Sequence, residues 1–287
     1  MSKNKTWKPI TKGFNQELND ALQQQHQAVQ LIAMVGRHLI AQEADDSNTN
    51  MQYYPELKMM VGNELENGLR VAVDLENMYL KVLDKELQAK KQFALEGKSK
   101  KMAIEKLRNI LWDLNVDVSN FKDELHYEIP KHKLDKEGVF SINNEDDFIE
   151  NAIYRNNAEL ILNEISEIHK LKEAVKVWPH HFDTGSFIPV SHNKKGDLSS
   201  SIGLGFAIPD TMINEPYYYL SFWSEKAIKD LENPEDLTVG QWMTPNWNGA
   251  VLKISDIMKA KSAQVQHQIV KDFYESGFKI LSPHFKI

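Results

Sequence analysis

The sequence predicts an α+β fold, with two successive helix–three-strand–helix halves around a mainly antiparallel sheet. Two observations lead to this prediction. Apolar residues recur with the period of an α-helix in several long segments, and between these segments they alternate as in β-strands. The order helix, strands, helix occurs twice along the chain, which suggests an internal duplication, although no residue-level repeat is visible.

The 287 residues are enough for one large domain or two ordinary ones. We place the first half at residues 1–116, a polar connection at 117–144, and the second half at 145–287. The second half carries the candidate site.

The first half begins with an amphipathic helix, and His26 lies in its apolar stripe, one turn after Leu22. Ser99 can cap the second helix of this half. The predicted elements are a helix over about 15–42, strands at 51–61, 69–75 and 78–83, a segment at 86–95 that fits either a strand or a helix, and a helix over about 100–114.

The strands of the second half are apolar at successive positions, as in 202–208, so we expect them to be covered on both faces. The pair Gly203 and Gly205 is expected to permit close packing against a neighbouring element. The predicted elements are a helix over about 145–172, strands at 175–190, 202–208 and 216–223, an irregular stretch, and a helix over about 254–276.

Composition excludes several classes of protein. The net charge of −7 argues against a nucleic-acid partner, and the absence of cysteine removes disulfides, thiolate metal sites and cysteine nucleophiles. No apolar run approaches the roughly 20 residues that span a bilayer, so we expect no membrane association. The basic N-terminus lacks the apolar segment of a signal peptide, and a cytoplasmic location is therefore expected. The sequence leaves the oligomeric state open.

The densest group of reactive side chains is the hexapeptide 178–183, Trp-Pro-His-His-Phe-Asp. In an extended strand His181 and Asp183 share one face, whereas His180 lies on the other face with Trp178. A carboxylate beside an imidazole suits a general base or a supported metal ligand. The alternative is a structural clamp that only braces the sheet. If Pro179 breaks the strand, both histidines could instead converge on one cavity.

Further candidates come from the next strands and from the first helix. Glu215 is a third catalytic candidate beside His181 and Asp183. Tyr217 and Tyr219 should point one way and Tyr218 the other, so the first two could bind a ligand. Trp178, His180 and His26 are additional ligand-binding candidates. Packing in the core is the alternative for each of them, and also for Trp242 and Trp247, which flank Pro245 in a loop that could line or cover a pocket.

Several of these motifs resemble an uncharacterised bacterial family known only as a domain of unknown function. The resemblance rests on the His-Phe-Asp motif at 181–183, the strand 205–210 with Gly-Phe-Ala-Ile-Pro-Asp, and Glu-Pro-Tyr-Tyr-Tyr at 215–219. The early helix with His26, Gln30 and Gly36 is also similar, whereas residues 178–180 depart from the family pattern. The resemblance implies a shared fold and a shared pocket, and it brings no established activity.

We therefore expect either an enzyme or a binding protein. The first hypothesis is an enzyme that acts on a small molecule through a buried His181/Asp183 pair, by general-base or metal-assisted chemistry. A divalent metal would have nitrogen and oxygen ligands only, and no nucleotide-cofactor motif is present. The alternatives are a non-catalytic protein that binds a small ligand through its tyrosines and tryptophans, and a structural module in which the pair only braces the sheet.

Overall fold

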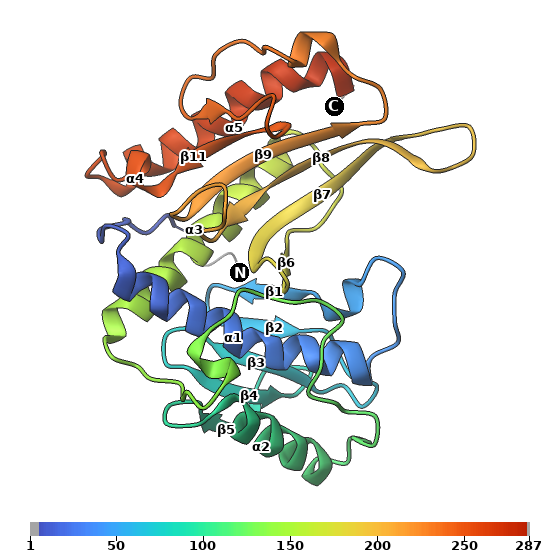
Figure 1. The fold of residues 1–287 in the computed structure, drawn as a ribbon, viewed down its shortest axis with the longest axis vertical. Helices are drawn as coiled ribbons and strands as arrows, with labels where there is room; N and C mark the ends of the chain where they lie inside the picture. Colours follow the sequence, from blue (N-terminus) through green and yellow to red (C-terminus); the bar gives the residue numbers. More distant parts are fainter. Residues whose placement is uncertain (1–5, 286–287) are drawn as a thin grey trace. The chain divides into compact units, whose positions relative to one another are not determined.

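The computed structural model describes residues 6–285, and within them it contains five α-helices and eleven strands (Figure 1). All strand pairs with a described register are antiparallel, and the mixture of helices with an antiparallel sheet confirms the α+β prediction. None of the helices in this range combines the length and apolarity that a bilayer-spanning segment needs. The elements are α1 (Gln16–Leu39), β1 (Met51–Tyr54), β2 (Met59–Gly62), β3 (Arg70–Asp74), β4 (Tyr79–Leu83), β5 (Ala89–Ala94), α2 (Lys100–Asp113), α3 (Glu145–Ile168), β6 (Lys176–Trp178), β7 (Asp183–His192), β8 (Leu198–Ala207), β9 (Tyr217–Ser224), β10 (Gln241–Trp242), β11 (Gly249–Lys253), α4 (Ile254–Ile257) and α5 (Ala263–Phe285).

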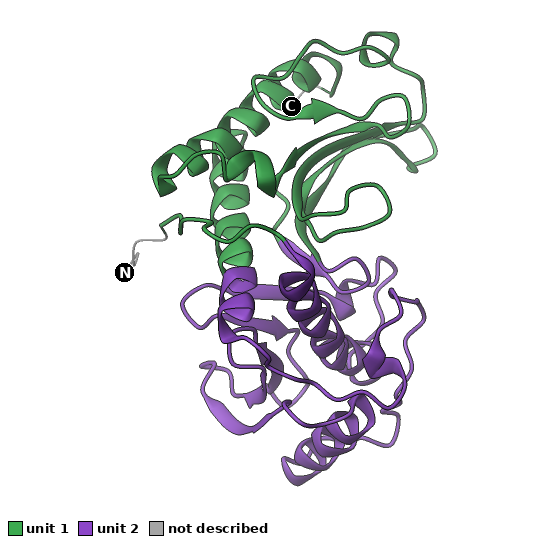
Figure 2. Ribbon diagram, turned by 60° about the vertical axis from the view of Figure 1, so that its left-hand side comes forward, with its two compact units in different colours: residues 1–14, 153–175, 183–287 green, residues 15–152, 176–182 purple. Residues whose placement is uncertain are grey.

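The chain divides into two compact units that are not continuous in sequence (Figure 2). Unit 1 consists of Met1–Phe14, Ile153–Val175 and Asp183–Ile287, and unit 2 consists of Asn15–Ala152 and Lys176–Phe182. Helix α3 contributes its first residues to unit 2 and the remainder to unit 1.

In unit 2 the strands follow the order β6-β1-β2-β3-β4-β5. Helix α1 packs against β2, where a Cβ atom on Gly62 would lie 2.4 Å from Cγ2 of Ile32. Glycine at this position therefore lets the helix lie close to the strand. The side chain of Ser99 accepts a hydrogen bond from the amide of Met102 and caps α2, as the sequence predicts.

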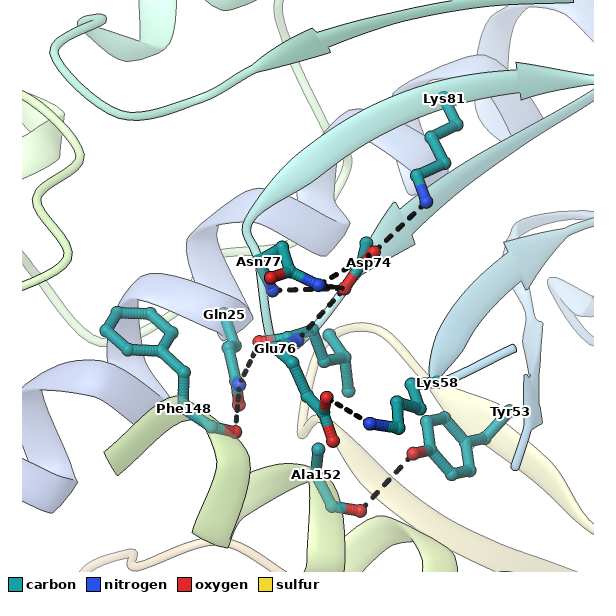
Figure 3. Close-up of polar contacts among 10 residues, drawn as sticks. Gln25, Tyr53, Lys58, Asp74, Glu76, Asn77, Lys81, Phe148 and Ala152 are labelled. Carbon is teal, nitrogen blue, oxygen red and sulfur yellow. Dashed lines mark hydrogen bonds and ion pairs between the residues drawn. The ribbon is translucent and has the colours of Figure 1, made fainter. Parts of the chain in front are cut away.

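Polar side chains hold the β3–β4 hairpin of unit 2 in place (Figure 3). The buried carboxylate of Asp74 accepts hydrogen bonds from the amides of Glu76 and Asn77 at 3.2 and 3.0 Å, and an ion pair from Nζ of Lys81 at 3.0 Å. The Gln25 side chain of α1 donates to the carbonyl oxygens of Leu75, at 2.8 Å, and Phe148, at 3.2 Å. One amide group thus joins the hairpin, α1 and the start of α3.

In unit 1 the strands follow the order β10-β11-β9-β8-β7, and α3 and α5 cover one face of this sheet. The Tyr274 hydroxyl of α5 donates to the carbonyl oxygen of Gly205 at 2.9 Å. Arg155 of α3 donates to Oγ1 of Thr184 at 2.9 Å. The covered face of the sheet is therefore the one that carries Thr184, Phe206 and Tyr218, whose rings and hydroxyl groups pack against the two helices.

Two amide side chains attach the extended N-terminal segment to these helices of unit 1. Asn157 of α3 accepts from the Lys8 amide at 2.9 Å and donates to the Lys8 carbonyl oxygen at 2.7 Å. Gln266 of α5 makes the same pair of contacts with Ile10, at 2.8 and 2.9 Å. Each side chain imitates the hydrogen bonding of a neighbouring strand.

The strand count differs from the predicted three in each half. Five strands lie between α1 and α2, and six lie between α3 and α4, so the hypothesis of an internal duplication is not supported. The predicted strand 51–61 is two strands joined by a turn in which Lys58 has a φ of 56°. Strands β10 and β11 lie in the stretch predicted to be irregular. The predicted helix 254–276 is divided into α4 and α5, and the Ser262 side chain accepts from the Val265 amide at the start of α5.

Candidate functional site

The hexapeptide does not form a continuous strand. After β6, residues 179–182 form a turn in which the Phe182 amide donates to the Trp178 carbonyl oxygen at 2.7 Å. Phe182 adopts a left-handed conformation with a φ of 51°, and Asp183 is the first residue of β7. The alternation expected for a strand therefore does not apply, and the predicted burial of His181 is wrong because its side chain is exposed in this turn.

His26 of α1 holds the turn from inside unit 2. Its Nε2 lies 2.9 Å from the Pro179 carbonyl oxygen, which also accepts a hydrogen bond from Gln30 at 2.9 Å. The imidazole ring stacks on Phe182 with centroids 5.2 Å apart and an interplanar angle of 8°. Because a carbonyl oxygen can only accept, Nε2 of His26 carries a proton. This geometry agrees with the packing alternative for His26.

The two histidines of the turn meet other aromatic rings of unit 2. The His180 ring lies 4.3 Å from His181, 5.7 Å from Tyr127 and 6.4 Å from Trp178, measured between centroids. Burial, with a smaller contribution from the charge of Asp46, raises the pKa of Tyr127 above its usual range. No group of three His, Asp or Glu side chains within residues 6–285 is arranged to hold a metal ion.

The tyrosines of β9 form two carboxylate–tyrosine pairs within unit 1, one with Asp183 of β7 and one with Asp210 in the loop after β8. Tyr219 donates a hydrogen bond to Oδ2 of Asp183 at 2.6 Å, and Tyr217 donates to Oδ2 of Asp210 at 2.7 Å. The rings of Tyr217 and Tyr219 are 6.5 Å apart, which confirms that they share a face. Glu215 takes no part in these pairs, because its carboxylate accepts from the amide and hydroxyl of Ser255 at 2.8 and 2.9 Å and fixes the start of α4.

Two glycines make room for the Tyr219 ring, and a third makes room for Oγ of Ser221, which a Cβ atom on Gly203 would approach to 2.6 Å. A Cβ atom on Gly205 would lie 2.5 Å from the phenolic carbon and oxygen of Tyr219, and one on Gly185 would lie 2.8 Å from that oxygen. A Cβ on Gly203 would lie 3.9 Å from the Tyr219 ring. The expectation that Gly203 and Gly205 permit close packing is confirmed, and the packing element is a side chain of the adjacent strand β9.

The surroundings of these hydroxyl groups keep them protonated. Burial, followed by the charge of Asp183 and the hydrogen bond to it, raises the pKa of Tyr219 well above its usual value. Burial, and then the hydrogen bond and charge of Asp210, does the same for the pKa of Tyr217. Both tyrosines are therefore donors to carboxylates and not bases.

The other face of the unit 1 sheet is partly open, which corrects the expectation that the strands are covered on both faces. Ile213, Met243 and Trp247 pack over one part of it, where Tyr217 and Val251 are buried. Phe187 on β7 is 49% exposed and Trp223 on β9 is 45% exposed. The register places them on the face that carries Tyr219, opposite the face covered by α3 and α5. The apolar run of β8 was misleading because its open-face positions are glycines, Gly203 and Gly205, which need no cover.

A groove of about 430 Å³ lies on this open face. Its floor is formed by Ser201, Gly203 and Ser221, and its walls include Phe187 and Trp223 and the β10–β11 loop with Trp247. The Trp247 ring packs over Gly249 and meets Tyr219 edge to face at a centroid distance of 6.4 Å. No charged side chain belongs to the lining, which consists of Phe187, Ser201, Gly203, Ser221, Phe222, Trp223, Pro245, Asn246, Trp247 and Asn248.

Sequence reasoning named Trp247 as a residue that could line a pocket, but it missed Phe187 and Trp223. The available signal was the alternation along β9, where Tyr217, Tyr219, Ser221 and Trp223 share one face. Comparison with protein families, with curated proteins and with solved structures finds no match to this chain.

Proposed function

We propose that this protein binds a small, neutral molecule with a flat apolar face, and that the groove on the open face of unit 1 is the binding site. The observation that carries the proposal is the position of Phe187, Trp223 and Trp247 around a floor of small residues. Aromatic side chains gathered around one groove are typical of a surface that contacts a partner or a ligand.

The chemistry of the lining defines the class of ligand. The volume of about 430 Å³ is typical of a small-molecule site. The lining contains no charged side chain, so a charged ligand would lose hydration without gaining an ionic partner. Aromatic rings bind flat apolar faces, while the hydroxyl groups of Ser201 and Ser221 and the amide of Asn246 can bind hydroxyl or amide groups of the ligand.

The lining of the groove favours binding over catalysis. The groove lining offers no carboxylate, imidazole or amine that could act as a general acid or base. Tyr219 and Asp183 support the groove indirectly, because Tyr219 contacts Trp247 and is itself held by Asp183. The predicted ligand residues Trp178, His180 and His26 belong to unit 2 and do not line this groove.

The test is a screen of neutral fragments, monosaccharides and nucleosides by ligand-observed NMR, repeated on Trp223→Ala. Trp112→Ala is the matched control, since Trp112 is also an exposed tryptophan, at 66%, and lies on α2 of unit 2. We expect Trp223→Ala to weaken binding by about tenfold or more, as truncation of a tryptophan at the centre of a site does, and Trp112→Ala to leave it unchanged. Hits that bind both variants equally would contradict the proposal.

A second pair of variants changes the floor without removing an aromatic ring. A Cβ atom on Gly203 would lie 2.6 Å from Oγ of Ser221, which can rotate away, so Gly203→Ala should narrow the groove while preserving the fold. Gly13→Ala is the control, because a Cβ atom there has no neighbour within 4 Å. Weaker binding in Gly203→Ala alone supports the groove as the site, and equal binding in the two variants opposes it.

A further inference from the structure

A second cavity of unit 1, of about 850 Å³, lies at the end of the β7–β8 hairpin. Figure 1 shows the β7–β8 hairpin (yellow to orange) extending beyond β9. The cavity is lined by the hairpin loop, by the residues that follow β9 and by the end of α5. It does not share a lining residue with the groove described above.

Positive charge gathers around this cavity although the chain as a whole carries −7. Lys194, Lys195 and Lys226 line it, and none of the three forms an ion pair within residues 6–285. The lining also contains two carboxylates, Asp197 and Glu225, and neither forms an ion pair with these lysines within residues 6–285. One of them, Asp197, is engaged in the hairpin turn, where it accepts a hydrogen bond from the Asn193 side chain at 3.3 Å. The ammonium groups are thus available to a ligand.

Serine hydroxyl groups supply hydrogen-bond donors in the same cavity. Oγ of Ser191 lies 2.8 Å from Oγ of Ser199 and 2.6 Å from Oγ of Ser200. Each contact uses one hydroxyl proton, and the three hydroxyl groups carry three protons. One proton therefore remains for an acceptor outside the cluster, whichever way the two hydrogen bonds run. Ser224, opposite Ser200 in the register, adds a further hydroxyl group to the lining.

Two features oppose the binding of an anion. The carboxylates of Asp197 and Glu225 offset two of the three ammonium charges, and a helix ends beside the cavity. The end of α5, at His284 and Phe285, borders the cavity, and a helix C-terminus carries about half a negative charge. The three ammonium groups carry full charges, and the imidazole of His284 can donate a hydrogen bond at this end. The balance around the cavity therefore favours an anionic ligand with several acceptor oxygens.

We propose that this cavity binds the phosphate group of a small, soluble phosphate monoester. Ammonium groups and hydroxyl donors are the groups that proteins use to bind phosphate oxygens. The volume of about 850 Å³ exceeds that of a phosphate ion and leaves room for the organic part of the ligand. The proposal is independent of the neutral-ligand groove, because the two cavities have different linings.

The experiment is a titration of the full chain with inorganic phosphate and with glycerol 3-phosphate at constant ionic strength, followed by amide NMR. We expect saturable shifts at Ser191, Ser199, Ser200 and Ser224, with tighter binding of the monoester. Lys226→Gln should weaken binding by about fivefold to tenfold, as loss of one charge-assisted hydrogen bond does. Lys229→Gln is the matched control, since Lys229 is also exposed, lies three residues away and does not line the cavity.

Two results would overturn the proposal. The first is a response that does not saturate or that chloride reproduces, which indicates only general attraction to lysines. The second is equal binding by Lys226→Gln and Lys229→Gln, which places the phosphate elsewhere. Trp223→Ala should leave phosphate binding unchanged, so failure at this cavity and failure at the groove are distinguishable.

Discussion

Phenylalanine substitutions at the adjacent residues Tyr218 and Tyr219 should have different effects on stability, with a loss at Tyr219 and no loss at Tyr218. Each substitution removes one phenolic oxygen and nothing else. The Tyr219 hydroxyl donates to Asp183 at 2.6 Å, whereas the buried Tyr218 hydroxyl has no hydrogen-bond partner within residues 6–285. The two residues lie on opposite faces of the same strand, so the strand itself is a common reference.

The magnitudes follow from these contacts. A hydrogen bond to a charged group contributes about 1.5–3 kcal/mol, and Oδ1 of Asp183 is already buried without a donor within the described residues. Tyr219→Phe would leave both oxygens of this carboxylate without a hydrogen bond. We therefore expect the free energy of unfolding to fall by about 3 kcal/mol, the upper end of that range. A buried hydroxyl without a partner costs about 1–3 kcal/mol, so Tyr218→Phe should be neutral or stabilise by about 1 kcal/mol once lost packing is included.

The assay is urea unfolding at 25 °C, followed by tryptophan fluorescence and circular dichroism. Since the chain has two compact units, the transition need not be two-state. Hydrogen exchange of peptides from β8 and β9 therefore measures the local effect within unit 1. The quantity of interest is the difference in unfolding free energy between the two variants, which we expect to be about 3–4 kcal/mol.

A result in which both variants lose similar stability would refute this reasoning. It would mean that the volume of the removed oxygen matters more than its hydrogen bond. Tyr79→Phe provides the control for the substitution itself, because no hydrogen bond of the half-buried Tyr79 hydroxyl is found within residues 6–285.

Three further predictions concern ionisable side chains. Asp74→Ala removes the turn acceptor and the Lys81 ion pair of the β3–β4 hairpin, and should cost about 2–3 kcal/mol in urea unfolding. Burial raises the pKa of Glu164, but Lys271 and His267 together outweigh burial and lower it. The contribution of the Glu164 carboxylate to the free energy of unfolding is therefore present above the unfolded pKa of 4.5 and is lost as the pH falls through the folded pKa. Glu164→Gln should therefore make urea unfolding less sensitive to acid, and an unchanged acid profile would oppose this. Burial is the first cause of the raised pKa of five tyrosines, namely Tyr127, Tyr217, Tyr218, Tyr219 and Tyr274. Their contribution to the free energy of unfolding is therefore fully present below about pH 10 and is lost at higher pH. Absorbance at 295 nm should show these tyrosines ionising only as the fold opens.

The sequence predicts the helices better than the strand breaks. Ser99 lies where a capping residue is expected, and its side chain does cap α2. The turns at Lys58 and Phe182 have φ values of 56° and 51° at residues other than glycine or asparagine. A proline begins each turn, Pro55 in the first and Pro179 in the second, so the sequence contained a signal for each break in 51–61 and 175–190, although the left-handed residue itself carried none.

In the candidate site, too, regular elements were predictable and irregular ones were not. The shared face of Tyr217 and Tyr219 was predictable because β9 is regular, whereas the relation of His181 to Asp183 was not, since a turn ends between them. The groove depends on which face of the sheet α3 and α5 cover. That choice is made by contacts between residues far apart in the chain, such as Tyr274 with Gly205, and no local pattern contains it.

The interleaving of the two units has a consequence for synthesis. The chain passes from one unit to the other after Phe14, Ala152, Val175 and Phe182. Every residue of unit 2 is therefore synthesised before α5 of unit 1, and the N-terminal segment at Ile10 must wait for Gln266, which is made near the end. No single cut of the gene separates the two units, so a truncated product would retain an incomplete unit 1 with its apolar surfaces uncovered.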